Sequence, residues 1–117
     1  MSSTAFQQVP KVRVEDPDTG NGGQPDYTPN VSGLSVLVLD NSFATVMGGG
    51  PSEASLPGGV EGQRLTIVGT GKEVVIFVEH PDLKLGNAGS WAGEKGDTLS
   101  LVLAGGIWYE TGRSKNH

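Results

Sequence analysis

The stretch Asp97-Thr-Leu-Ser-Leu-Val-Leu-Ala-Gly-Gly-Ile-Trp-Tyr-Glu-Thr111 decides the fold class of this chain. Its first half alternates apolar and polar side chains, which is the pattern of a strand with one buried face. The glycines of Ala104-Gly-Gly106 then predict a hairpin turn. The chain returns as a second strand from Ile107, which places Trp108 opposite Leu103 or one of its neighbours.

Similar runs recur upstream at about every 10 residues and are separated by glycine-rich turns. The predicted strands cover 34–39, 63–68, 73–79 and 83–85, with shorter candidates at 43–47 and 54–56. Because this rhythm is typical of sandwiches, jelly rolls and small barrels, we expect an all-β, jelly-roll-like β-sandwich. We expect no helix of more than one turn, and we expect Gly89-Ser-Trp-Ala-Gly93 to form a loop.

The chain divides near residue 33, because the first 33 residues hold only 8 apolar residues whereas residues 34–112 hold 33. The first part cannot bury a core of its own, and Gly20-Asn-Gly-Gly-Gln-Pro25 has the composition of a linker. The sequence therefore predicts an extended N-terminal arm and linker over 1–33, a β-sandwich domain over 34–114 and a short tail over 115–117.

One short stretch of the arm has strand character. Val12 and Val14 alternate with basic residues, and Pro10 restricts such a strand to an edge or to its first positions. Because an edge strand outside the main core usually pairs with something else, we expect this stretch to bind another protein. The candidate binding residues are Val9, Pro10, Val12 and Val14.

Composition excludes several classes of protein. A length of 117 residues suits one domain, and 26 glycines and prolines argue against a helix bundle. The net charge of −5 argues against nucleic acid as a partner, since phosphate binding needs clustered Lys and Arg. No apolar run is long enough to span a membrane, and we expect no secretory signal at the N-terminus. Without cysteine there is no disulfide framework.

The motifs that could carry chemistry are weak. Gly69-Thr-Gly-Lys72 lacks the preceding glycine and the following Ser or Thr of a phosphate-binding loop. A metal could use His80 with Glu79 or Asp82, but neighbouring strand residues point to opposite faces. The only other histidine, His117, lies near the end of the chain, and no nucleophile elbow is present. We therefore expect no enzyme activity, no metal and no cofactor.

Three aromatic residues are candidates for the core or for an interface. Trp108 and Tyr109 lie within the returning strand, where a large ring is usually packed in a core or between subunits. Trp91 lies in the expected loop, where it could anchor the loop over one end of the domain or provide a platform for a sugar.

The last third of the chain resembles a known group of proteins. The run from Gly96-Asp-Thr-Leu-Ser-Leu-Val-Leu through the glycine turn to Ile-Trp-Tyr-Glu-Thr-Gly-Arg-Ser114 resembles the closing hairpin of β-rich bacteriophage virion proteins. Leu56-Pro-Gly-Gly-Val-Glu-Gly-Gln-Arg-Leu-Thr-Ile-Val68 resembles the strands that precede it. The group includes capsid decoration (cement) proteins and modules of tail fibres and tailspikes.

This resemblance implies a structural protein on the capsid surface of a virion, with the major capsid protein as its partner. Decoration proteins of this kind form trimers or dimers, and we expect a homo-oligomer, with a trimer favoured over a dimer. The arm would add an edge strand to capsid protein or to a sister subunit. The alternative is a receptor- or glycan-binding module of a tail fibre, with recognition by the loops around Trp91 and Gly48-Gly-Gly-Pro51.

Overall fold

The protein is all-β in the parts that the computed structural model describes, which are residues 11–15, 29–40, 45–47, 56–71, 75–79, 81–86 and 89–116. These residues contain strands and turns but no helix. The strands are β1 (Val12–Glu15), β2 (Val36–Leu39), β3 (Thr45–Met47), β4 (Arg64–Gly69), β5 (Val75–Val78), β6 (Leu83–Lys84), β7 (Ser90–Gly93), β8 (Thr98–Ala104) and β9 (Ile107–Ser114).

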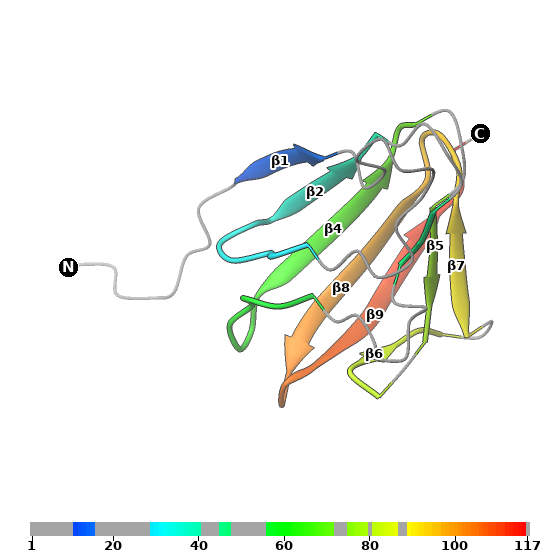
Figure 1. Ribbon diagram of the computed structural model, residues 1–117. Helices are drawn as coiled ribbons and strands as arrows, with labels where there is room; N and C mark the ends of the chain where they lie inside the picture. Colours follow the sequence, from blue (N-terminus) through cyan, green and yellow to red (C-terminus); the bar gives the residue numbers. More distant parts are fainter. Residues whose placement is uncertain are drawn as a thin grey trace.

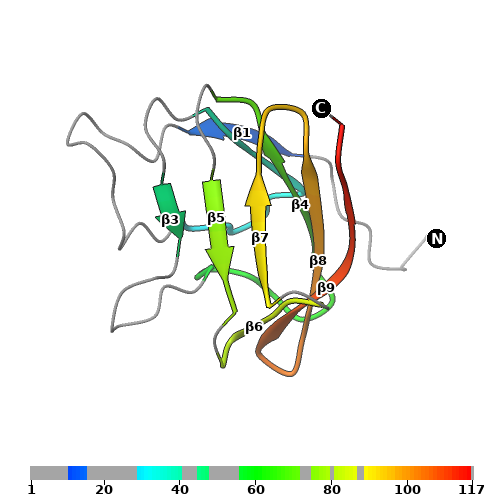
Figure 2. The same ribbon diagram turned by 90° about the vertical axis from the view of Figure 1, so that its right-hand side faces the viewer.

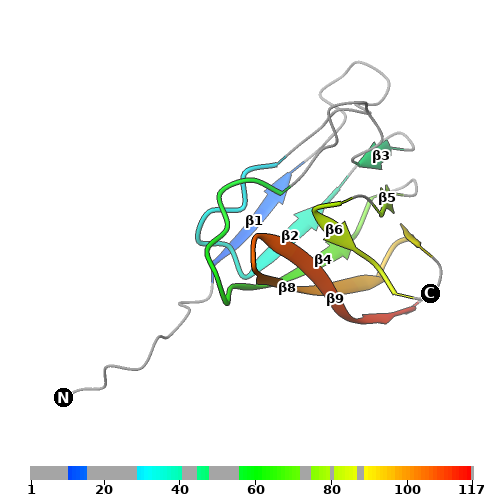
Figure 3. The same cartoon turned by 90° about the horizontal axis from the view of Figure 1, so that it is seen from below.

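Six of these strands form one curved sheet in the order β1-β2-β4-β8-β9-β6 (Figure 1). The pairs β1–β2, β2–β4 and β6–β9 are parallel, whereas β8 is antiparallel to both of its neighbours. Seen from below, β1, β2, β4, β8 and β9 follow one another around the curve (Figure 3). β1 and the two-residue β6 form the ends of the sheet, and β6 covers only two residues of the long strand β9.

The remaining strands form a second sheet in the order β3-β5-β7. Figure 2 shows these three strands side by side, in front of the larger sheet. A tight turn over 94–97 carries the chain from β7 in the small sheet to β8 in the large one. In that turn the N–H of Asp97 donates to the carbonyl of Glu94 at 2.9 Å, and the N–H of Gly96 donates to Gly69 at 2.7 Å.

The core is built mainly from one face of β2, β4 and β8, with single residues from β5, β6, β7 and β9 and a few from the loops. In β4 and β8 buried and half-buried side chains alternate, as the sequence pattern predicts. The buried apolar set is Val31, Leu34, Leu37, Leu39, Leu56, Leu65, Ile67, Phe77, Leu83, Leu85, Trp91, Leu99, Leu101, Leu103 and Trp108. Since each such side chain contributes about 1.5–3 kcal/mol when it leaves water, this cluster is the main stabilising feature of the fold.

The sequence predictions for the strands at 34–39, 63–68, 73–79, 83–85 and 97–103 are confirmed to within a few residues. The predicted hairpin is confirmed as well. Gly105 and Gly106 have φ angles of 63° and 79°, a conformation that glycine adopts without strain, and Leu103 lies opposite Trp108. The shorter candidate at 43–47 holds β3, whereas Leu56 belongs to no strand and residues 54–55 lie outside the described residues.

The expectation that Gly89–Gly93 forms a loop is wrong, because Ser90–Gly93 is strand β7 and pairs with β5. Trp91 and Gly93 are buried, and the Trp91 ring packs against Phe77 with ring centroids 5.8 Å apart. A Cβ atom at Gly93 would collide with the indole ring of Trp91. This glycine therefore makes room for a large neighbour, a packing role that a sequence pattern does not distinguish from a turn.

The stretch predicted as part of an arm lies in the larger sheet of its own chain. The carbonyl of Lys11 accepts hydrogen bonds from the N–H groups of Ser35 (2.9 Å) and Val36 (3.1 Å), and the N–H of Lys11 donates to the Ser35 hydroxyl at 2.8 Å. Pro29 and Val31, also within the predicted arm and linker, are buried. Residues 1–10 and 16–28 lie outside the described residues, so the arm itself stays a prediction.

Candidate interaction surface

Strand β1 has one side that no described strand covers. It lies at the end of the six-stranded sheet, and its neighbour β2 takes the backbone groups of Arg13 and Glu15. This follows from the hydrogen bonds at the strand's two ends, where the carbonyls of Lys11 and Glu15 accept from β2 and the residue after it. Successive residues of a strand in a parallel ladder direct their backbone groups to opposite sides. Because Lys11, Arg13 and Glu15 face β2, Val12 and Val14 direct their N–H and C=O groups outward.

The side chains of the same two valines are exposed. Val12 is 60% accessible and Val14 is 64% accessible. On the outer face of the sheet, Val12 lies beside Val36 and Val14 lies beside Val38. Val36 and Val38 are half-buried, and Val68 lies beside Val38 on the next strand. An outward backbone edge and an exposed apolar row thus meet at β1, which is the combination that strand addition uses.

Arg13 holds β1 against the loop that precedes β2. One nitrogen of its guanidinium group donates to the carboxylate of Glu15 at 2.9 Å and to the carbonyl of Asn30 at 2.7 Å. Both charged side chains of this ion pair are partly exposed, so the pair contributes at most about 1 kcal/mol. The Asn30 side chain in turn accepts from the N–H of Ser32 at 2.9 Å. These contacts attach β1 to the loop before β2 and leave its outer edge uncovered by any described strand.

The structure separates the other candidate residues. Trp108 is buried, and its indole N–H donates to the carbonyl of Leu56 at 3.2 Å, so the ring belongs to the core of this chain. Trp91 is buried as well. Tyr109 is 41% accessible and lies on the outer face in register with Lys84, so it remains a candidate for an interface. Val9, Pro10 and Gly48–Pro51 lie outside the described residues.

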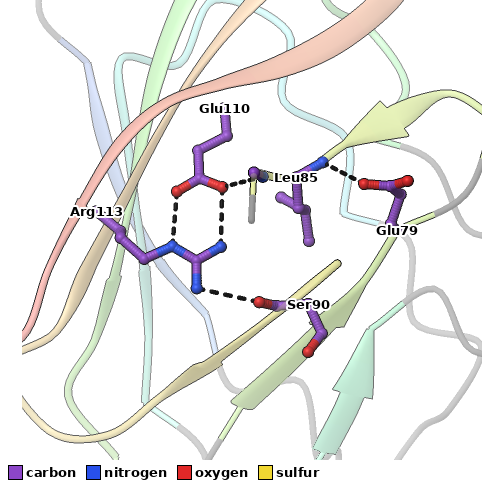
Figure 4. A network of polar contacts seen from close by, with 6 residues as sticks. Glu79, Leu85, Ser90, Glu110 and Arg113 are labelled. Carbon is purple, nitrogen blue, oxygen red and sulfur yellow. Dashed lines mark hydrogen bonds and ion pairs between the residues drawn. The ribbon is translucent and has the colours of Figure 1, made fainter. Parts of the chain in front are cut away.

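An ion pair links both sheets at the other end of the molecule (Figure 4). The guanidinium group of Arg113 donates two hydrogen bonds to the carboxylate of Glu110, at 2.6 and 2.8 Å, and a third to the carbonyl of Ser90 at 3.1 Å. Glu110 also accepts the N–H of Gly86 at 2.6 Å. One side chain of β9 therefore reaches β7 in the small sheet, and its partner holds the turn that follows β6.

These contacts shift the protonation of the carboxylates. The hydrogen bonds from Arg113, with a smaller contribution from Gly86, hold the pKa of Glu110 below its usual range although partial burial opposes the shift. The same pair raises the pKa of Arg113. At the hairpin, the N–H groups of Gly105 (2.6 Å) and Gly106 (3.1 Å) donate to Glu61 and lower the pKa of that exposed carboxylate.

Two buried polar side chains were missed by the sequence reasoning. The amide nitrogen of Gln63 donates to the carbonyls of Val31 (2.9 Å) and Leu34 (2.7 Å), and its oxygen accepts the N–H of Val60 at 3.0 Å. Asp97 accepts the N–H groups of Glu94 (3.0 Å) and Asn116 (2.8 Å). A Gly-Asp pair before a strand is a visible turn signal, but nothing in the sequence marks Gln63 as a buried residue that ties a loop to the sheet.

The described residues include part of the metal and phosphate motifs considered in the sequence. Within them no three His, Cys, Asp or Glu side chains gather closely enough to hold a metal ion. The Glu79 carboxylate accepts the N–H of Leu85 at 2.9 Å, and Asp82 lies in the turn before β6, while His80 and His117 lie outside the described part. Gly69 ends β4 and donates to the carbonyl of Asp97, which is a structural role. No helix that could cross a membrane occurs in the described ranges.

Comparison of the chain with protein-family models, with curated proteins and with solved structures finds no match. The interpretation of its function therefore depends on its own residues.

Proposed function

We propose that this protein is a virion structural protein that decorates and cements a bacteriophage capsid by bridging neighbouring capsid subunits. In this proposal the two sheets are the halves of a jelly-roll-like β-sandwich, and the residues before β1 form an extended arm. The resemblance of residues 54–114 to decoration proteins supports the proposal, and the uncovered edge of β1 supplies the means of attachment.

The edge of β1 is the observation that carries the proposal. A capsid strand that pairs with β1 would use the outward backbone groups of Val12 and Val14 and would cover their exposed side chains. An interface of about 1,600 Å² is enough for specific attachment, and the exposed valine row and Tyr109 would extend the contact beyond one strand. Repetition over a capsid lattice adds avidity, because every domain that bridges two subunits must be released before they separate.

The runner-up function, a glycan- or receptor-binding module, has less support. A sugar platform needs an aromatic ring that is open to solvent, and Trp91 is only 3% accessible. The net charge of −5 is compatible with an outward-facing surface in either function.

The location of the protein on particles tests the proposal directly. Immunogold electron microscopy of phage particles, with an antibody against this chain, should label the whole capsid shell. Labelling confined to the tail would replace the proposal with the fibre module, and particles without any label would refute both.

Positive charge on the edge of β1 should prevent the protein from binding to the capsid. The double variant Val12→Lys and Val14→Lys places two ammonium groups where a capsid strand would pack, and lysine on an edge strand disfavours strand pairing. We expect the occupancy of capsids reconstituted with this variant to fall at least tenfold, as measured by cosedimentation.

The matched control is Val60→Lys, because Val60 is similarly exposed, at 56%, and lies in the turn before β4 and not on β1. Both variants should keep the unfolding midpoint of the unmodified protein. An equal loss of occupancy in the control, or no loss in the double variant, would show that β1 is not the attachment site.

A further inference from the structure

A hollow of about 280 Å³ opens between β7 and the last residues of β9. It is lined by Ser90, Trp91 and Ala92 on one side and by Arg113, Ser114 and Lys115 on the other, with Asp97 at its end. Figure 4 shows the Arg113 side chain reaching from β9 across to the Ser90 carbonyl. The hollow thus separates one strand of the small sheet from one strand of the large sheet.

The backbone of β7 faces this hollow with groups that no described strand takes. Trp91 lies opposite Phe77, and two residues further along both strands the N–H of Glu79 donates to the carbonyl of Gly89 at 3.0 Å. In an antiparallel ladder this pattern directs the backbone of Trp91 toward β5 and the backbone of Ala92 away from it. The Ser90 carbonyl, which follows the same alternation, is the group that accepts from Arg113.

The backbone of β9 faces the hollow in the same way. Leu103 exchanges hydrogen bonds with Gly62 and Gln63, so this residue of β8 faces β4. Leu99, four residues earlier on the same strand, has the same orientation and lies opposite Arg113. Arg113 therefore directs its N–H and C=O away from β8 and toward the hollow.

Strand β6 shows how this space can be filled. It pairs with β9 only at Leu83–Trp108 and Lys84–Tyr109, and the chain then turns away, where the N–H groups of Leu85 and Gly86 are held by Glu79 and Glu110. The hollow lies further along β9, at the level that a longer β6 would reach. The hollow is therefore a slot between the edges of β7 and β9, and no described strand lies in it.

We propose that this slot receives an extended segment from residues 1–10 of a second copy of the chain. The segment would lie between β7 and β9 and would replace the hydrogen bond from the Arg113 side chain to the Ser90 carbonyl. It would bond to the backbone of Ala92 on one side and of Arg113 on the other, and so join the two sheets. The proposal specifies the sister subunit as the arm's partner in the proposed function, and it needs no capsid.

The chemistry of the slot suits this segment. The charged groups at the slot already have partners, because Arg113 binds Glu110 and the Asp97 carboxylate accepts two backbone N–H groups. An inserted strand should therefore bring few charges of its own. Residues 1–10 carry no charged side chain, and Ser2-Ser-Thr-Ala5 are small enough to lie between two closely spaced backbones.

The reach of the segment favours a second copy over the same chain. The slot lies on the far side of β9 from β1, at five strand spacings, or about 24 Å at ~4.8 Å each. Ten extended residues span about 33 Å, and four of them inside the slot use about 13 Å. The roughly 20 Å that remains is shorter than this path of about 24 Å along the sheet, which favours the slot of a second copy over the chain's own slot.

Disulfide trapping tests the proposal, because the chain has no cysteine of its own. One protein carries Ser3→Cys, Thr4→Cys or Ala5→Cys, which covers the possible registers, and the other carries Ala92→Cys. After the two folded proteins are mixed and oxidised, we expect a covalent heterodimer for at least one of the three positions, at a yield at least tenfold above the control.

The control replaces Ala92→Cys by Val60→Cys, an exposed position away from the slot. Equal yields with both acceptors, or no heterodimer with Ala92→Cys at any position, would overturn the proposal. So would a double variant of one chain that closes an internal disulfide while remaining monomeric. Capsid labelling without trapping would leave the proposed function standing, whereas trapping without labelling would leave only the slot.

Discussion

At the scale of single residues, the buried side chains that matter most are those with a specific partner. Trp108 is buried in the core, and its indole N–H donates to the carbonyl of Leu56. Gly59 packs against the ring so closely that a Cβ atom at this position would come within 2.7 Å of it. Gln63 satisfies three backbone groups at once. A tryptophan in a strand predicted a packing role for Trp108, either in a core or between subunits. A buried glutamine has no periodic signature, because its role depends on loops that are far away in the chain.

Removal of the Trp108 ring should be among the most costly single substitutions. Trp108→Ala leaves a large cavity and an unpaired carbonyl at Leu56, so we expect a loss of about 3–5 kcal/mol in the free energy of unfolding. Urea denaturation followed by circular dichroism measures this loss. Tyr109→Ala, on the exposed neighbour, should cost under about 1 kcal/mol, and similar costs for both variants would contradict the assignment of Trp108 to the core.

At the scale of elements, alternation predicted which residues form strands, but it could not predict which strands pair. Residues 36–39 lie between β1 and β4, and both of these partners are parallel and more than 20 residues away in sequence. The local hairpin of β8 and β9 was the one pairing visible in the sequence, since its turn is short. Strand β7 was hidden because its glycine and serine residues have the composition of a turn.

The ion pair between Glu110 and Arg113 should make the link between β9, β6 and β7 sensitive to acid. The pKa of Glu110 is lower in the folded protein than its usual value of 4.5, so its ionised form stabilises the fold above that pH. This contribution is lost as the pH falls through the lower, folded pKa. We expect the unmodified protein to lose more stability between pH 6 and pH 3 than Glu110→Gln, in urea titrations at each pH.

The glutamine variant retains the shape of the side chain but removes the titration. If both proteins show the same dependence on pH, the ion pair does not contribute to the acid sensitivity.

At the scale of the whole molecule, the large sheet ends differently on its two sides. One end has the β1 edge, and the other has the slot beside β9. A donor segment and an acceptor slot on different surfaces give head-to-tail contacts, which close into a ring such as a trimer or continue as a filament. The alternation of Val12 and Val14 with basic residues indicated a binding strand in the sequence, whereas the slot exists only when distant strands are brought together.

Two truncations should distinguish the role of residues 1–10 in self-association from the role of β1 in stability. Removal of residues 1–10 leaves β1 in place, so we expect the monomer to keep its unfolding midpoint while self-association falls at least tenfold in analytical ultracentrifugation. Removal of residues 1–15 also removes β1 and uncovers β2, so this shorter protein should be less stable. If the first truncation associates like the full chain, residues 1–10 do not mediate assembly.

The order of the strands along the chain also determines when this protein can fold. Strand β4 pairs with β8 over separations of 30 to 38 residues, and in the sheet order β4 lies between β8 and the pair β1–β2. A ribosome adds roughly 5–20 residues per second. Strands β1, β2 and β4 are therefore synthesised seconds before the β8–β9 hairpin that completes their sheet. Long-range pairing of this kind makes folding slow, and we expect β8 and β9 to form the nucleus on which the earlier strands assemble.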